Sequence, residues 1–324
     1  MIKNLLNFYK KINISNPPYD YNFILNLEEK EYPLYLARLF KINTGEKLPI
    51  LKEWRFKSGE WSYKIDKKKL KTFNQKIQWI KLYGITDLMR DCTDKVKVRD
   101  FIREKIGAEY LKPVLQICNS FDEIDFNKFP DSLVIKCNHG CKWHYIIKNK
   151  EEYLKNKRLV EITRRNITGW LEQDYSLWGG FEIQYRGIQP KILIEPLLRD
   201  DINTSPREIE VYCFNGVPKI FVNVKYKEKR EICYYDENLN FIDLLFHPDG
   251  NNKIIKEKTD DLLYRTIDLS SRLSKDFSFV RVDWLIYKNQ LYFNELTFTP
   301  YSGFIKFDKN WNLKLGSWIK QKGK

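Results

Sequence analysis

The sequence has no hydrophobic stretch long enough to cross a bilayer. No window of 18 consecutive residues is apolar, whereas a membrane-spanning helix needs about 20 such residues. The first residues, MIKNLLNFYKKINIS, also lack the apolar segment and the small-residue cleavage site of a secretory signal. We therefore expect a cytoplasmic protein without a transmembrane segment.

Cysteine and histidine are scarce, with six Cys and three His in 324 residues. Only Cys137 and Cys141 lie close together, and His139 and His144 flank Cys141. No second pair of Cys or His follows at the spacing of a zinc site. The sequence therefore predicts free thiols in a reducing compartment rather than a zinc site or a disulfide framework.

Acidic residues are outnumbered by basic ones. The chain has 57 Lys and Arg against 43 Asp and Glu, a formal net charge of +14. Such a charge suits nucleic acid, an acidic membrane surface or an anionic substrate. The basic residues are spread along the whole chain, and no zinc-finger or RNA-recognition motif accompanies them. We expect no nucleic-acid partner and an anionic substrate, and peripheral association with the inner membrane face remains compatible with the charge.

Apolar residues make up 43% of the chain and aromatic residues 15%, enough for a sizeable core, because a chain of this length buries about three quarters of its surface. Helical spacing of apolar residues predicts helices over 72–83, 94–106, 150–175 and 257–275. Strands are predicted at 113–118, 132–137, 143–147, 191–198, 208–216, 217–226, 231–236, 277–287 and 290–298. The fold class is α+β. Its predicted parts are an N-terminal helical and aromatic region (1–90), a linking subdomain (91–131), a small lobe (132–200) and a larger lobe (201–324).

Two carboxylates lie inside neighbouring apolar strands. Asp283 is within FVRVDWLIY (279–287), and Glu295 is within LYFNELTF (291–298). A carboxylate inside a strand is costly unless it is paired or bound to a cation. Because Arg281 shares a face with Asp283, the group suits Mg²⁺ and phosphate. An Arg–Asp–Glu salt-bridge cluster explains the same residues equally well.

Three further features suit a nucleotide. Lys136 lies in LVIKCNHG (133–140), where a lysine before a turn can reach phosphates; a lysine that extends its ammonium to solvent is the alternative. Glu195, followed by Pro196 in ILIEPLL, marks an extended hinge whose backbone can bond an adenine edge. Lys95 follows Asp94 at a predicted helix N-terminus, which favours phosphate.

Taken along the chain, the features are a lysine, a lysine before a turn, a glutamate at a hinge, an Arg-x-Asp pair and a glutamate on the next strand. This order resembles the ATP-grasp superfamily. The ordered blocks from TFNQKIQWIKLY through LVIKCNHG and ILIEPLL to YFNELTFTPYSG resemble the TupA-like ATP-grasp family over residues 70–316. That family is associated with the synthesis of teichuronopeptide, capsule and other surface polysaccharides. The resemblance implies an ATP-grasp fold, in which the nucleotide lies between two α+β lobes.

The resemblance also implies which residues bind ATP. Those that would hold its phosphates, directly or from the loop over them, are Lys95, Lys136, Asn138, His139 and Gly140. Those that would bind adenine are Glu195, Pro196 and Leu197, the last through its backbone.

Mg²⁺ would be held by Asp283, Glu295 and Thr297, with Thr297 standing where many ATP-grasp ligases have an Asn. Arg281 and Lys136 are the implied catalytic residues. Arg281 would stabilise the transferring γ-phosphoryl group and the acyl phosphate.

Two positions depart from the family pattern. The phosphate loop has Cys141, Lys142 and Trp143 where a more glycine-rich loop is usual. Position 210 is Glu where the pattern has Lys, and the segment REIE (207–210) resembles the corresponding stretch of D-alanine–D-alanine ligases instead.

The implied activity is that of an ATP- and Mg²⁺-dependent carboxylate–amine ligase. The carboxylate would belong to a uronic acid of a surface glycan or sugar nucleotide, and the amine to an amino acid or amino alcohol. Residues that could bind this anionic acceptor, or simply form a solvated basic face, are Arg199, Lys225, Lys227 and Arg230. The alternatives are a kinase for sugar hydroxyls and a non-catalytic protein that binds glycan or nucleic acid.

Overall fold

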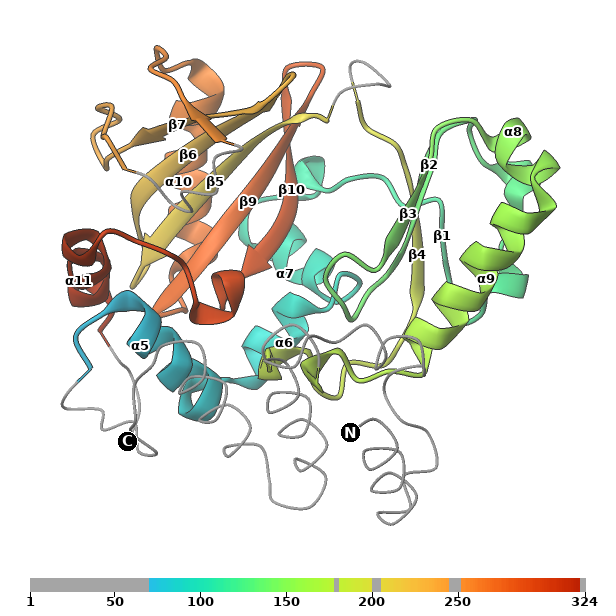
Figure 1. Cartoon of the computed structure of the whole chain (residues 1–324), viewed down its shortest axis with the longest axis horizontal. Helices are drawn as coiled ribbons and strands as arrows, with labels where there is room; N and C mark the ends of the chain where they lie inside the picture. Colours follow the sequence, from blue (N-terminus) through green and yellow to red (C-terminus); the bar gives the residue numbers. More distant parts are fainter. Residues whose placement is uncertain (1–69, 178–180, 200–204, 245–251, 321–324) are drawn as a thin grey trace, which may run out of the picture.

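The computed structural model describes residues 70–177, 181–199, 205–244 and 252–320. Two sheets stand side by side, each with its own hydrophobic core (Figure 1). This arrangement confirms the predicted α+β class with two lobes. The predicted N-terminal region lies, up to residue 69, outside the described residues.

The described residues of the small lobe form a four-stranded antiparallel sheet. Its strands run in the order β1 (Gln116–Cys118), β4 (Ile192–Pro196), β2 (Leu133–Cys137) and β3 (His144–Ile147). Two helices, α8 (Lys150–Lys155) and α9 (Lys157–Leu171), pack on one face of this sheet (Figure 1). The helix predicted at 150–175 is divided at Asn156, whose side chain caps α9. Alternate residues of β2 are buried, so Lys136 projects from the face away from α9.

In the described part of the chain, the large lobe is built on a six-stranded sheet. Its order is β10 (Gln290–Thr297), β9 (Phe279–Tyr287), β5 (Arg207–Phe214), β6 (Val217–Tyr226), β7 (Arg230–Tyr235) and β8 (Asn252–Ile254), and only the β7–β8 pair is parallel. Helix α10 (Asp261–Ser274) packs on β5, β6 and β9. The predicted apolar stripe of this helix, including Leu262, Leu269 and Leu273, is buried against the sheet. On the opposite face, Phe214 and Phe279 pack against Phe73 of α5. The charged residues lie further along the same face, and β9 and β10 lie nearest the small lobe (Figure 1).

Two tight turns set the register of the large sheet. Asn215 and Gly216, between β5 and β6, both have positive φ (52° and 83°). Lys288 and Asn289, between β9 and β10, do so as well (48° and 59°). Two consecutive residues of this kind are what a two-residue hairpin turn requires. Both turns were predicted from the sequence, and both are confirmed.

Four helical segments complete the large-lobe core. They are α5 (Phe73–Trp79) with a π-helical turn (Ile80–Gly84), α6 (Asp87–Thr93), α7 (Val98–Lys105) and α11 (Lys309–Trp318). Helix α11 packs on α5 so closely that a Cβ on Gly316 would lie 2.2 Å from the carbonyl oxygen of Lys71. Short 3₁₀ turns lie at Ala108–Tyr110, Phe121–Glu123, Phe126–Lys128, Tyr175–Leu177, Ile183–Tyr185 and Pro300–Gly303.

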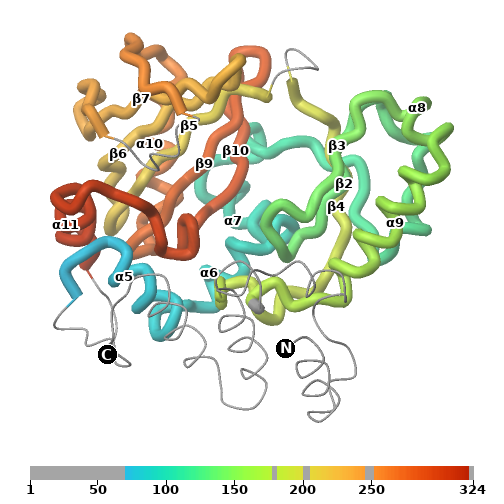
Figure 2. Tube along the Cα trace, in the orientation of Figure 1, coloured from blue at the N-terminus to red at the C-terminus, as the bar shows by residue number. Residues whose placement is uncertain are grey.

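The predicted linking subdomain contributes to both lobes. Helix α7 packs into the large-lobe core, whereas β1 pairs with β4 of the small sheet. Figure 2 shows the chain entering the small lobe after α7 and leaving it after β4. Among the helices that the structure describes, none is both long and apolar enough to span a membrane.

Candidate active site

Three strands of the large sheet bring charged side chains together on the face opposite α10. Strand pairing places Asp283 opposite Glu295, and Arg281 opposite Thr297. Strand β5 adds Glu210, which pairs with Asp283 on its other side. Directly paired residues project from the same face of a sheet. We call this face, with these five residues, the site face.

A β-bulge adds one further side chain to the site face. Asn294 is an extra residue between Phe293 and Glu295, where the pairing of β10 with β9 shifts. Phe293 and Leu296 are buried in the core, whereas Asn294 and Glu295 are both partly exposed. Two consecutive residues of one strand therefore face the site, which a regular strand does not allow.

Arg281 lies at the centre of the acidic side chains. Its Nε and Nη2 donate to the two oxygens of Asp283, at 2.7 and 2.6 Å. Two further carboxylates lie near the guanidinium. An oxygen of Glu210 is 3.7 Å from Nη1, and an oxygen of Glu295 is 3.7 Å from Nη2. Around Arg281 itself, three carboxylates face one guanidinium, which leaves an excess of negative charge at this point.

The two central carboxyl groups differ in their surroundings. Burial raises the pKa of Asp283, and the ion pair with Arg281 opposes that rise. Burial acts on Glu295 in the same direction, but Arg281 and Lys95 outweigh it and hold the pKa of Glu295 below its ordinary value. A divalent cation placed here would favour the ionised form of both groups.

The donor atoms on the site face suit a hard cation that is shared with phosphate. The hydroxyl of Thr297 lies 3.2 Å from an oxygen of Asp283 and 3.2 Å from an oxygen of Glu295, so the two carboxylates converge. Among the residues that the structure describes, no group of three His, Cys, Asp or Glu is arranged to hold a metal. The protein would therefore supply two carboxylates, as Mg²⁺ sites that complete their coordination with water and phosphate commonly do.

On the small lobe, two lysines share one buried carboxylate. Lys136 Nζ donates to Glu195 Oε2 at 2.6 Å. Lys112 Nζ lies 3.7 Å from the same oxygen and donates to Asn294 Oδ1 at 2.8 Å. Burial raises the pKa of Glu195, but the two ammonium groups outweigh it and lower the pKa to about 2. The predicted phosphate ligand Lys136 and the predicted adenine ligand Glu195 therefore bind each other in this structure.

Sequence reasoning missed Lys112. Its only signal was a basic residue directly before Pro113 at the start of a predicted strand. In a chain with many lysines, that signal is too common to single out one residue.

The loop after β2 is fixed by buried polar side chains. Asn138 Nδ2 donates to Asp94 Oδ1 at 2.9 Å, and Asn138 Oδ1 accepts from the backbone N–H of Lys191 at 2.7 Å. His139 is also buried, with Nε2 3.0 Å from the carbonyl oxygen of Trp170, and burial lowers its pKa. Both side chains thus make contacts within the protein that hold the loop in shape.

Aromatic packing takes the place of the missing glycines in this loop. The ring of Trp143 stacks on Trp170 (6.0 Å, 2°) and meets Tyr175 edge-on at 5.0 Å. A Cβ on Gly140 would lie 2.4 Å from the Trp143 ring. Lys95 Nζ donates to the carbonyl oxygen of Gly140 at 2.6 Å, so one predicted phosphate-binding lysine lies directly at the loop.

We expect Gly140→Ala to destabilise the protein by about 1–3 kcal/mol, because the added methyl forces Trp143 out of its stack. Thermal unfolding measures this loss. Gly169→Ala in α9 is the matched control, since a Cβ there meets only the end of Gln173 at 4.0 Å and alanine favours helix. Equal unfolding temperatures for Gly140→Ala and the wild type would contradict the packing argument.

The predicted hinge residues lie at the end of β4. Pro196 pairs with Leu133 of β2, and the backbone N–H of Leu197 donates to the carbonyl oxygen of Ser132 at 3.2 Å. Glu195 pairs with Val134, which places it diagonally from Lys136 on the sheet. The hinge is thus continuous with the small sheet.

The segment REIE (207–210) alternates between the two faces of the large sheet. Arg207 lies on the α10 face and binds Asp260, the N-cap of α10. Glu208 and Glu210 both lie on the site face, where Tyr226 donates its hydroxyl to Glu208 at 3.2 Å. Burial, and then the neighbouring Glu210, raise the pKa of Glu208 to about 7.

Ion pairs hold the candidate acceptor-binding residues Lys225, Lys227 and Arg230. The pairs are Lys225 with Glu257 (2.8 Å), Lys227 with Glu231 (2.8 Å) and Arg230 with Glu210 (3.4 Å). Arg230 shares a face with Glu208 and Glu210 through its pairing with Tyr226. Among these three cations, Arg230 is the one on the site face.

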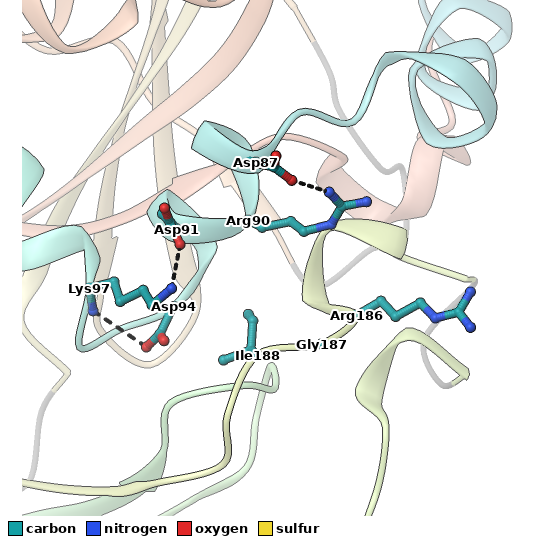
Figure 3. A pocket seen from close by; sticks show the side chains of 8 residues that line it. All are labelled: Asp87, Arg90, Asp91, Asp94, Lys97, Arg186, Gly187 and Ile188. Carbon is teal, nitrogen blue, oxygen red and sulfur yellow. Dashed lines mark hydrogen bonds and ion pairs between the residues drawn. The ribbon is translucent and has the colours of Figure 1, made fainter.

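A pocket of about 330 Å³ lies beside the loop (Figure 3). It is lined by Asp87, Arg90, Asp91, Asp94, Lys97, Arg186, Gly187 and Ile188. Arg90 binds Asp87 and Lys97 binds Asp91, each at 2.7 Å, so charges within the lining compensate one another (Figure 3). The described lining includes none of the predicted ATP or metal ligands, and Asp94 connects it to the loop through Asn138.

A family model described as TupA-like ATPgrasp matches residues 75–320. The chain belongs to the TupA-like ATP-grasp family. The match confirms the family and the ATP-grasp fold that the sequence blocks had indicated. A comparison with curated proteins finds no match.

Solved structures similar to this family member include two ligases and a synthetase. D-alanine–D-alanine ligase from Bacillus anthracis, complexed with ATP, is 15% identical over 64% of this chain and 54% of that chain, with a TM-score of 0.39. The Helicobacter pylori ligase is 14% identical over 71% and 61%, with a TM-score of 0.39. N5-carboxyaminoimidazole ribonucleotide synthetase from Thermus thermophilus is 10% identical over 81% and 56%, with a TM-score of 0.34. The chain thus spans little more than half the length of these proteins.

Proposed function

We propose that this TupA-like ATP-grasp protein is an ATP- and Mg²⁺-dependent carboxylate–amine ligase. The observation that carries the proposal is an acidic group on the large lobe that faces two lysines, Lys95 between α6 and α7 and Lys136 on the small lobe. Asp283 and Glu295 converge around Arg281, and Lys95 lies close enough to lower the pKa of Glu295. Carboxylates on one side and ammonium groups on the other suit a magnesium–triphosphate.

Each charged group has a place in the proposed chemistry. Lys95 and Lys136 would bind the ATP phosphates, and Asp283 and Glu295 would hold Mg²⁺, which would neutralise the phosphate oxygens. Arg281 would stabilise the charge that develops on the γ-phosphoryl group.

The proposed reaction has two balanced steps. A carboxylate oxygen of the acceptor attacks the γ-phosphorus, ADP leaves, and an acyl phosphate forms. An amine then attacks the acyl carbon, phosphate leaves, and the nitrogen loses a proton to give the amide. Because acyl phosphates hydrolyse readily, the loop from Asn138 to Trp143 would shield this step from water.

The proposed acceptor is anionic, a uronic acid of a surface glycan or of a sugar nucleotide, and the proposed donor is an amino acid or amino alcohol. The net charge of +14 and the place of Arg230 on the site face support an anionic acceptor. The family's association with surface polysaccharides supports a uronic acid. A cytoplasmic location, with peripheral association at the inner membrane face, is proposed on the same grounds.

We expect the wild type to bind ATP in a titration calorimeter when Mg²⁺ is present and to bind it much more weakly with EDTA. Incubation with ATP, uronic acids and amines should then release phosphate and form an amide, detected by mass spectrometry. A phosphate ester would instead identify a kinase. Failure of the folded wild type to bind Mg²⁺–ATP would contradict the proposed nucleotide site.

A further inference from the structure

Lys112 connects the two lobes at the candidate active site. Its ammonium donates to Asn294 on the large lobe at 2.8 Å and lies 3.7 Å from Glu195 on the small lobe. The side chain is largely buried, with 12% of its surface exposed, although it comes from neither sheet. Neither the family comparison nor the sequence pattern gives this residue a role.

Two ammonium groups therefore crowd one carboxylate oxygen. Lys136 holds Glu195 Oε2 at 2.6 Å, and Lys112 is the second cation on that oxygen. Burial, and then repulsion from Lys136, lower the pKa of Lys112 to about 8. Glu195 alone cannot compensate two largely buried cations, and Glu295 on the large lobe offsets only part of the difference. An incoming phosphate would relieve the positive charge that is left.

In the proposed function, Lys136 binds a phosphate, and Glu195 then needs another cation. If Lys136 turns away from Glu195 to bind an ATP phosphate, Glu195 loses its closest cation. A carboxylate that is buried and loses its cation is strongly unfavourable. The side chain of Glu195 is only 6% exposed, so water cannot replace the lost partner.

We propose that Lys112 is the replacement counter-ion of Glu195 in the nucleotide-bound state. When Lys136 turns to the phosphates, the ammonium of Lys112 takes its place on Glu195. This proposal rests on the proposed function, because it requires a nucleotide phosphate at Lys136. Lys112 is thus a positioning residue, which acts on the nucleotide through Glu195 and Lys136.

Lys112 needs to move only a short distance to bind Glu195 directly. The Lys112–Glu195 distance must shorten by about 1 Å to reach that of a charge-assisted hydrogen bond. A lysine ammonium has three donors, so Lys112 can keep Asn294 while it binds Glu195. In that state one side chain would bind both lobes, and nucleotide binding would strengthen the contact between them.

The test is a double-mutant cycle on Mg²⁺–ATP affinity, measured by calorimetry. We expect Lys112→Met to raise the Kd at least about tenfold, because Glu195 then has no cation once Lys136 moves. Without nucleotide, the same variant should unfold close to the wild-type temperature, since Lys136 still compensates Glu195. Lys112→Arg should keep most of the affinity. In a Glu195→Gln background, Lys112→Met should change the Kd by less than about twofold.

Other results would contradict either the role of Lys112 or the proposed function. An unchanged Kd for Lys112→Met would overturn the proposal, as would a nucleotide-free variant that unfolds early or does not fold, since Lys112 would then be a static tie between the lobes. An equal loss in both backgrounds would show direct contact between Lys112 and the nucleotide, which also overturns it. Wild-type protein that binds no Mg²⁺–ATP would instead refute the proposed function. Lys128→Met, at an exposed lysine of the same lobe, should match the wild type throughout.

Discussion

Glu295→Gln should weaken the binding of Mg²⁺ in the ATP complex by at least about a hundredfold while leaving the protein folded. The amide keeps an oxygen for Thr297 but removes the charge that Mg²⁺ requires. The lowered pKa of Glu295 means that the variant loses some stability, but the side chain is 37% exposed and the short hydrogen bonds of Arg281 go to Asp283, so the apo protein should stay folded. Calorimetric titration of ATP at several Mg²⁺ concentrations measures the change.

Asp283→Asn should impair Mg²⁺ binding to a similar degree but also destabilise the apo protein. Asp283 is buried and makes both short hydrogen bonds to Arg281, so the variant leaves a buried guanidinium without its main partner. Glu231→Gln is the matched control, because Glu231 binds Lys227 and Lys253 at the far edge of the sheet. Wild-type Mg²⁺ dependence in Glu295→Gln would mean that the Arg–Asp–Glu group is a structural salt-bridge cluster.

Glu208→Gln should make the protein more stable than the wild type above pH 7, by about 3 kcal/mol. The folded-state pKa of Glu208 is raised to about 7 by burial and by Glu210. In the unfolded chain the pKa returns to the ordinary glutamate value near 4.5. The folded protein therefore binds more protons than the unfolded chain between these values. Its stability falls as the pH rises from about 4.5 to about 7, and glutamine removes that loss.

Urea unfolding of wild type and Glu208→Gln at several pH values tests whether the stability of the wild type falls as the pH rises. The difference in unfolding free energy should grow between pH 5 and pH 7 and then stay constant. Glu231→Gln should show no such gain, because hydrogen bonds from Lys227 and Lys253 lower the pKa of Glu231. A pH-independent difference for Glu208→Gln would contradict the assigned cause.

The sequence predicted those parts of the fold whose reasons are local. Asn215 and Gly216 specify a turn by themselves, and Asp283 stands out because its apolar neighbours on β9 define a buried strand. Helix α11 and strand β8 were not predicted. Helix α11 buries little of its own surface, mainly Leu315 and Gly316, and β8 is three residues long. Both depend on partners distant in sequence, which short-range periodicity does not reveal.

The sequence pointed to individual charged residues of the site, but it did not predict which of them contact one another. Each of Lys136 and Glu195 suggested a nucleotide ligand when considered alone. Their ion pair depends on the register of β2 against β4, which places Glu195 opposite Val134 and diagonal to Lys136. Lys112 joins them only because the chain between α7 and β1 passes the same point. Long-range register and chain path therefore set the electrostatics of the site.

The bulge in β10 suggests how a ligand site can grow without disturbing the core beneath it. Removing Asn294 would leave a regular strand in which Phe293 and Leu296 still point inward and Glu295 still faces Arg281. The extra residue adds one side chain to the site face and changes nothing on the buried face. The same extra residue, Asn294, is the partner of Lys112 on the large lobe, so the bulge also supplies the contact between the lobes. Deleting Asn294 should therefore remove the interlobe hydrogen bond of Lys112 while leaving the core packing of β10 in place.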